Sequence, residues 1–187
     1  MNEMLKQALR RPRLRLHGPV DHDWIDRFAE VADALPEQDV LAVEVMTEGG
    51  DAEVGRRLAL EAGLQRARGR RLAFLGKTVV YSAGVTFMAG FRPEERWLTP
   101  DCRLLIHGRQ LTKQIALDGP LGACRRQLEK ALSEIETGFE LEREGFQMLA
   151  EGSRLSVEAI AREARDNWYL SAPEALGHGL IAGVFEG

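Results

Sequence analysis

Residues 79–90 have the sequence VVYSAGVTFMAG, in which a β-branched apolar run passes directly into a stretch of small residues. The apolar run is typical of a buried strand, and Ala83–Ala89 is typical of a short helix. Ser82 stands between them. A serine at such a turn lies beside the free backbone N–H groups and the positive dipole end of the following helix. The stretch therefore allows two interpretations of Ser82, a structural helix cap or an exposed nucleophile.

The segments on both sides of this stretch alternate between strand patterns and helix patterns. Strands are expected near 13–17, 40–46, 71–75, 97–98, 104–107 and 181–185. Helices are expected near 24–35, 52–68, 83–89, 121–150 and 156–165, and from Ser171 onward. Such alternation predicts parallel β-α-β units and an α/β fold. Binding and catalytic residues commonly lie in the loops after the carboxyl ends of parallel strands. The candidate site segments are therefore 47–51, 81–84 and His107.

Length and composition predict one globular domain spanning 1–187. The chain is 44% hydrophobic and 29% charged, which is ordinary for a protein with a core. Its net charge of −4 does not indicate a nucleic-acid partner. The N-terminus lacks a signal-peptide pattern and no apolar run is long enough to cross a membrane. We therefore expect a cytoplasmic protein without a membrane partner.

Neither a cofactor nor a metal is predicted. Cys102 and Cys124 lack the spacing of metal ligands, and we expect them to be reduced thiols. The chain has no phosphate-binding G-x-x-x-x-G-K-[ST] loop, so any use of ATP would belong to a partner.

Three features of the sequence match the requirements of acyl transfer. This chemistry needs a nucleophilic hydroxyl, a base within reach, and N–H donors aimed at the developing oxyanion. Ser82 offers the hydroxyl, His107 follows an apolar strand where a base would be rigidly placed, and Gly49-Gly50 allows a backbone to come close. Each feature also has a purely structural interpretation, as a cap, a structural histidine and a turn.

The order and spacing of these residues resemble those of the proteolytic subunit of the Clp protease, from about Arg13 to Val184. Thr47-Glu-Gly-Gly is similar to the Ser-Pro-Gly-Gly turn of that family, Tyr81-Ser-Ala-Gly to its nucleophile turn, and Leu104-Leu-Ile-His to its base segment. Leu170-Ser-Ala-Pro-Glu-Ala is similar to its C-terminal motif. The resemblance implies that Ser82 is the nucleophile and His107 the general base. It also implies that the N–H groups of Gly50 and Ala83 form the oxyanion hole.

The same resemblance implies an architecture and a set of partners. The fold would be the Clp/crotonase spiral of β-β-α units with a projecting helical handle. The handle region would be about 108–150, with its long helix from Leu121, and 1–12 would be an N-terminal segment. In this family the handles interlock two rings into a chamber. The implied partners are a peptide or unfolded protein substrate, further copies of the chain in a homo-oligomeric ring, and an ATP-dependent unfoldase.

The chain departs from the family pattern at the third member of the catalytic triad. Asn167 stands where the family has an aspartate, and the neighbouring Asp166 is an alternative third member. Asparagine can accept the imidazole N–H but cannot stabilise the imidazolium by charge. The expected function is therefore a slow serine endopeptidase of Clp type. The alternatives are a catalytically idle Clp-like subunit and, less favoured, a crotonase-type acyl-CoA enzyme.

Two other departures bear on the substrate channel and on assembly. Glu48 replaces the proline of the family's Ser-Pro-Gly-Gly turn. Residues 109–116 replace a glycine-rich strand, and they are more charged than such a strand would be. We expect 108–120 to be a loop or irregular arm.

Overall fold

A seven-stranded sheet forms the centre of the computed structural model, which describes residues 3–187. Residues 1–2 of the predicted N-terminal segment 1–12 lie outside the described residues. The strands are β1 (Leu14–His17), β2 (Val40–Thr47), β3 (Arg71–Tyr81), β4 (Arg96–Leu98), β5 (Arg103–Ile106), β6 (Trp168–Ser171) and β7 (Gly183–Val184). The helices are α1 (Glu3–Arg10), α2 (His22–Ala34), α3 (Ala52–Ala67), α4 (Ala83–Ala89), α5 (Leu121–Ala150), α6 (Val157–Ala164) and α7 (Ala172–Gly177), with a 3-10 turn at Pro93–Glu95.

Strand β3 is the element that organises the sheet. The order β1-β2-β3-β4-β7 is parallel throughout, and β5 pairs in parallel with β3 and antiparallel with β6. The first part of β3 pairs with β4, from Phe74 to Gly76, whereas its last part, 79–81, pairs with β5. Between these parts the register with β2 shifts and Thr78 has a φ of 57°. This bulge redirects the strand, so the ends of β3 and β5 lie side by side.

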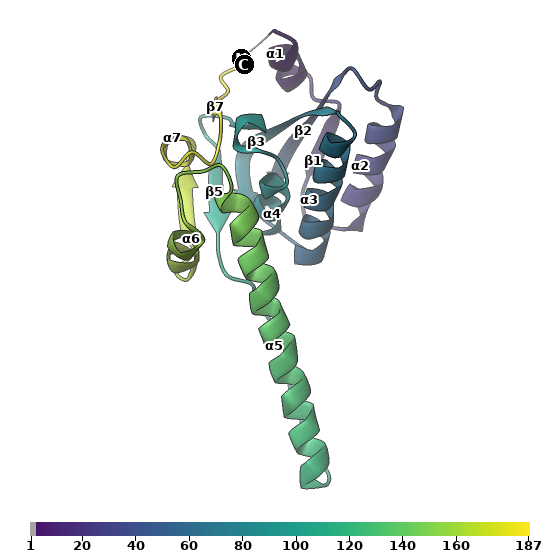
Figure 1. Cartoon of the computed structure of the whole chain (residues 1–187), viewed down its shortest axis with the longest axis vertical. Coiled ribbons are helices and arrows are strands. Elements are labelled where there is room, and N and C mark those ends of the chain that lie inside the picture. The colour runs from purple at the N-terminus through teal and green to yellow at the C-terminus, as the bar shows by residue number, and fades with distance from the viewer. Residues whose placement is uncertain (1–2) are drawn as a thin grey trace.

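The alternation of side chains along the central strands produces a core on each face of the sheet. Leu41, Val43 and Phe74 join the larger cluster beneath α2, α3 and α4, whereas Ala42 and Leu75 join a smaller cluster. Figure 1 shows α2 and α3 together on one side of the strands. The fold is thus a mixed α/β arrangement of the expected class.

Helix α1 was not predicted from the sequence. It covers the smaller cluster, because Leu9 is 1% exposed and packs with residues such as Val40 and Phe185. Arg10 donates to the Gly187 carbonyl at 3.1 Å, which ties α1 to the C-terminal residue. The segment 1–12 therefore contains a packed helix.

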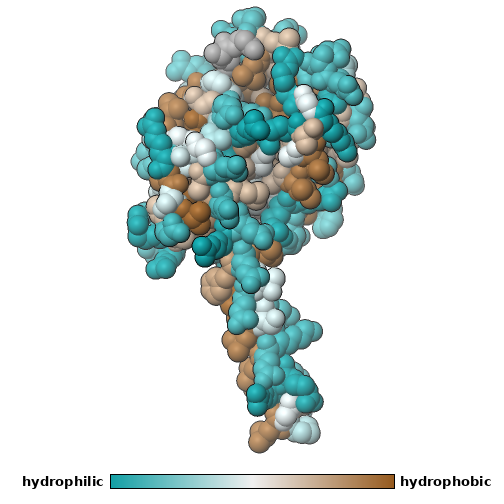
Figure 2. Space-filling model, viewed as in Figure 1, coloured by the Kyte–Doolittle hydropathy of each residue, from teal (hydrophilic) through white to brown (hydrophobic). Residues whose placement is uncertain are grey.

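Helix α5 forms a handle that projects from the head of the molecule (Figure 1). It has 30 residues, which corresponds to about 45 Å at the rise of an α-helix. Phe146 and Leu149, near its end, are buried in the core of the head. Figure 2 shows apolar side chains along the projecting part, and the exposed ones include Leu128, Leu132, Ile135 and Phe139. None of the helices in residues 3–187 is long and apolar enough to cross a membrane.

The segment between β5 and α5 has no helix or strand from His107 to Pro120. The expectation of an irregular arm at 108–120 agrees with this, and the predicted strand 104–107 ends at Ile106. Leu111, Ile115 and Leu117 on this segment are more than 40% exposed. The hydrophobic core therefore does little to fix its position.

Candidate active site

Ser82 occupies a strained backbone conformation at the start of α4. Its φ of 54° and ψ of −116° lie in a region that residues with a Cβ rarely adopt. Its N–H donates to the Leu105 carbonyl at 2.9 Å, which holds the turn against β5. Ser82 is at the N-cap position, yet its side chain makes no capping hydrogen bond. The hydroxyl is therefore not used in the way that a structural cap would use it.

The Gly49-Gly50 turn lies against Ser82. A Cβ added to Gly49 would lie 2.9 Å from the Cβ of Ser82, so only glycine allows this approach. Thr47 fixes the turn, since its Oγ1 accepts the N–H of Gly49 at 3.0 Å. Gly50 forms a parallel bridge with Val20. The turn and the nucleophile are thus held together by close backbone packing.

Two backbone N–H groups near Ser82, those of Gly50 and Ala83, have no hydrogen-bond partner in the described chain. In the bridge, the Val20 N–H donates to the Gly49 carbonyl, and the Asp51 N–H donates to the Val20 carbonyl. No hydrogen bond involves the Gly50 N–H within the described part of the chain. The N–H of Ala83 belongs to the first residue of α4 and has no partner inside the helix. Unused backbone N–H groups beside Ser82 are what a pair of oxyanion donors would require.

A cavity of about 430 Å³ brings the predicted residues together. Gly50, Ser82, Ala83 and His107 all line it. Its other walls include the apolar Val85, Phe146 and Leu149 and the charged Glu48, Arg56, Arg109 and Glu142. The cavity thus combines an apolar wall with a larger set of polar and charged groups, which could orient a bound peptide.

His107 lines the cavity, and its ring is hydrogen-bonded to the backbone of the next residue. Its Nδ1 lies 2.6 Å from the carbonyl oxygen of Gly108. A carbonyl oxygen only accepts, so Nδ1 carries the proton and Nε2 has the free lone pair. No hydrogen bond joins His107 to Ser82 among the described residues. Ser82 and His107 thus line the same cavity without a hydrogen bond between them.

The predicted third member, Asn167, is close to His107 in the sheet but makes no hydrogen bond to its ring. Asn167 is exposed, has a φ of 57° and immediately precedes β6. The antiparallel pairing of Ile106 with Trp168 places Asn167 next to His107 along the two strands. Neither Asn167 nor Asp166 lines the cavity, and neither is hydrogen-bonded to the imidazole. The Gly108 carbonyl occupies the Nδ1 position that the third member would otherwise fill.

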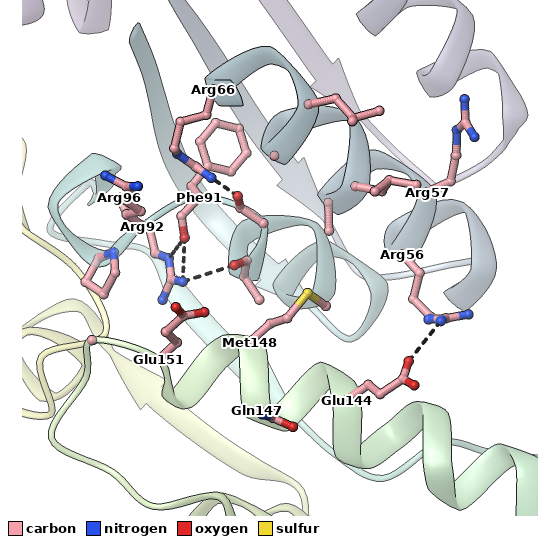
Figure 3. A pocket seen from close by; sticks show the side chains of 18 of the residues that line it. Arg56, Arg57, Arg66, Phe91, Arg92, Arg96, Glu144, Gln147, Met148 and Glu151 are labelled. Carbon is pink, nitrogen blue, oxygen red and sulfur yellow. Dashed lines mark hydrogen bonds and ion pairs between the residues drawn. The ribbon is translucent and has the colours of Figure 1, made fainter. Parts of the chain in front are cut away.

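A larger cavity of about 1050 Å³ lies beyond Arg56, between α3, the end of α4 and α5 (Figure 3). Arg96 lines it and is 1% exposed. Its guanidinium donates to the carbonyls of Phe91, Ala89 and Leu180 at 2.5 to 3.2 Å. Burial lowers the pKa of Arg96 to about 10. This arginine links the end of α4 to the C-terminal segment and is a structural element of the head.

Sequence reasoning missed the charged residues around the nucleophile. Arg56 and Glu142 lie far apart in the sequence, and their helical patterns gave no sign that both would reach the cavity. Phe146 was predicted only as part of an apolar stripe on the handle. No group of three or more potential metal ligands gathers within residues 3–187. Burial raises the pKa of Cys102 to about 12, so its thiol is not a competing nucleophile.

The family model for Clp protease matches residues 3–187. The chain belongs to the Clp protease family. Among solved structures, an asparagine-to-aspartate mutant of ClpP1 from Listeria monocytogenes has a TM-score of 0.76 and 16% sequence identity. The match covers 98% of this chain and 96% of that one. No curated protein matched the chain by sequence.

These findings confirm the resemblance and the Clp/crotonase-type fold that were inferred from the sequence. They support a Clp-like peptidase as the general function.

Proposed function

We propose that this Clp-family protein is a slow serine peptidase that hydrolyses peptide bonds through an acyl-enzyme on Ser82. The observation that carries the proposal is the placement of Ser82. Its side chain makes no capping hydrogen bond to α4, although Ser82 is at the N-cap position. Ser82 lines one cavity together with His107, Gly50 and Ala83. A helix cap would need none of these neighbours.

The proposed reaction begins with attack of the Ser82 oxygen on the carbonyl carbon of the scissile peptide bond. His107 Nε2 takes the hydroxyl proton, and the oxyanion accepts hydrogen bonds from Gly50 and Ala83. The imidazolium then gives its proton to the leaving amine, which leaves an ester on Ser82. Water, deprotonated by Nε2, hydrolyses the ester and restores the serine.

The proposed rate is low because the imidazolium lacks an anionic partner. Nδ1 of His107 donates to the Gly108 carbonyl, which fixes the tautomer but brings no full negative charge. Asn167 could replace that carbonyl only with another neutral acceptor. Contact between His107 and Ser82 also requires a rearrangement from the arrangement described above.

A catalytically idle subunit is the second candidate function. The lack of a hydrogen bond between Ser82 and His107 in the described chain favours it, together with the exposed position of Asn167. Membership of the Clp protease family favours both of these candidates over an acyl-CoA enzyme.

The proposed assembly is a ring of identical subunits. Members of the family usually form rings with ATPase partners, and the exposed apolar residues of α5 offer a surface for contact between copies (Figure 2). The proposed substrates are short peptides or unfolded chains, delivered in the second case by an unfoldase.

Fluorophosphonate labelling read by intact mass tests the nucleophile. The parent protein should gain one adduct, Ser82→Ala should gain none, and Asn167→Asp should label faster. Labelling of Asn167→Asp alone would replace the slow peptidase with the idle subunit. No labelling of either protein would overturn the assignment of Ser82 and His107.

A further inference from the structure

An ionic network encloses the side of the active-site cavity that holds His107. Its members are Glu53 and Arg56 on α3, Arg109 two residues after the base, and Glu142 and Glu144 on α5. We call this network the clamp. Its residues come from three segments that approach one another only in the folded chain.

Each pair of these segments is joined by at least one contact of the clamp. The guanidinium of Arg109 donates to Glu53, which joins the base segment to the first turn of α3. The backbone N–H of Arg109 donates to Glu142 at 2.5 Å, which joins the same segment to α5. Arg56 closes the triangle by donating to Glu144 at 3.1 Å, a link drawn in Figure 3.

Glu53 connects the two halves of the catalytic site. It lies three residues after Gly50, the first oxyanion donor, and it pairs with Arg109, two residues after His107. Partial burial opposes ionisation of Glu53, but hydrogen bonds from Arg56 and Arg109 outweigh it and keep its pKa below the ordinary value. The carboxylate is therefore charged at neutral pH and shared by two arginines.

The base segment has few other anchors. Gly108 donates to the Ala164 carbonyl at a long 3.3 Å, and in the described chain the next side-chain contact after Arg109 is that of Lys113 with Glu134. Residues 107–120 have no helix or strand, and their large apolar side chains are exposed. A segment of this kind opens locally without unfolding of the whole protein.

We infer that Glu53 and Glu142 are positioning residues that hold the His107 segment against the nucleophile and the oxyanion turn. The inference rests on the proposed function for its effect on catalysis. The clamp pairs are half exposed, and such pairs add little to global stability. These pairs instead order residues 107–112 locally, because few other contacts hold this segment in place.

Hydrogen exchange of the full-length protein measures this ordering without reference to catalysis. In Glu142→Ala, amides in 107–112 should exchange roughly tenfold faster, as expected for loss of one hydrogen bond to a charged group. Glu53→Gln keeps an acceptor oxygen but removes the charge that pairs with Arg109, so the same amides should exchange faster by a smaller factor. Thermal midpoints should stay close to that of the parent. The matched control is Glu61→Gln, which removes the Arg57–Glu61 pair from the same helix α3 without touching the base segment.

Two further comparisons separate positioning from a general structural effect. Glu142→Gln keeps an oxygen that can accept the Arg109 N–H, so its exchange should rise less than that of Glu142→Ala. The fluorophosphonate labelling rate of Ser82 should fall in the same order, and peptide cleavage should lose kcat with KM unchanged. Unchanged exchange in both Glu53→Gln and Glu142→Ala, or an equal rise in Glu61→Gln, would overturn the inference. If the parent takes up no label, the proposed function fails. The exchange data still test whether the clamp orders residues 107–112.

Discussion

Substitution of Gly50 by alanine gives a direct test of the oxyanion turn. The φ of Gly50 is +152°, and an added Cβ would lie 2.4 Å from the carbonyl oxygen of Val20 and 2.6 Å from its nitrogen. Both are backbone atoms of the bridging segment, so neither can move aside as a side chain would. The bridge between Val20 and Gly50 must open in Gly50→Ala.

The expected magnitudes follow from what the opening removes. The bridge is held by Val20 N–H to Gly49 at 2.9 Å and by Asp51 N–H to Val20 at 2.8 Å. Loss of both, with the strain of a positive φ at alanine, should destabilise the fold by about 3 kcal/mol. Displacement of one oxyanion donor should slow turnover by about 10²–10³-fold.

The assay follows labelling of Ser82 and cleavage of a short peptide under conditions in which circular dichroism shows Gly50→Ala to be folded. Gly63→Ala is the matched control, because no atom lies within 4 Å of the added Cβ and this glycine is inside α3. It should gain about 0.5–1 kcal/mol in stability with unchanged labelling. A folded Gly50→Ala protein that labels as fast as the parent would show that Gly50 does not supply an oxyanion donor.

Two further predictions concern buried charges. Arg96→Met should lower the free energy of unfolding, measured in urea melts, by about 2–4 kcal/mol, because the carbonyls of Phe91, Ala89 and Leu180 lose their donor. The control Arg92→Met replaces an exposed arginine and should change this free energy little. Equal effects of the two substitutions would refute the structural role of Arg96. Burial of Glu44 opposes its ionisation, but hydrogen bonds from Lys77 and His17 prevail and lower its pKa below 4.5. The resulting stability is present above pH 4.5 and is lost as the pH falls through the lowered pKa. Glu44→Gln should therefore be less stable than the parent by about 1 kcal/mol at pH 7. This difference in the free energy of unfolding should disappear in melts below pH 4.5. A difference that persists at that pH would contradict this account.

The elements around Ser82 were predictable because their signals are local. Alternating apolar residues in 13–17 gave β1, and Ser171 with Glu174 gave the capping box that starts α7. Strand β3 was predicted to end at Leu75 because Gly76 and Lys77 interrupt the apolar pattern. It continues to Tyr81 because its pairing partner changes from β4 to β5, an event that involves distant segments.

The short elements that were missed depend on tertiary contacts. Helix α1 has only eight residues, and its apolar face, which includes Leu5, Ala8 and Leu9, packs against the second face of the sheet. Its helical spacing was present in the sequence but was overlooked. Strand β6 has four residues and is held by pairing with β5, more than sixty residues earlier in the chain. That pairing leaves no periodic pattern in the local sequence.

The sequence by itself determined the candidate nucleophile, base and oxyanion donors. Ser82, His107, Gly50 and Ala83 lie at strand ends and turns, and parallel strands bring such ends to one edge of a sheet. The tertiary structure alone decided what surrounds them. Phe146 and Leu149, at the end of α5 that enters the head, form one wall of the cavity. The clamp joins three segments that are remote in the sequence. Local periodicity does not specify which side chains of remote segments come into contact in the folded head. The hydrogen bond of the His107 ring to the Gly108 carbonyl, where the family pattern would have the third member, is of the same kind, because it depends on the path of the chain after Ile106.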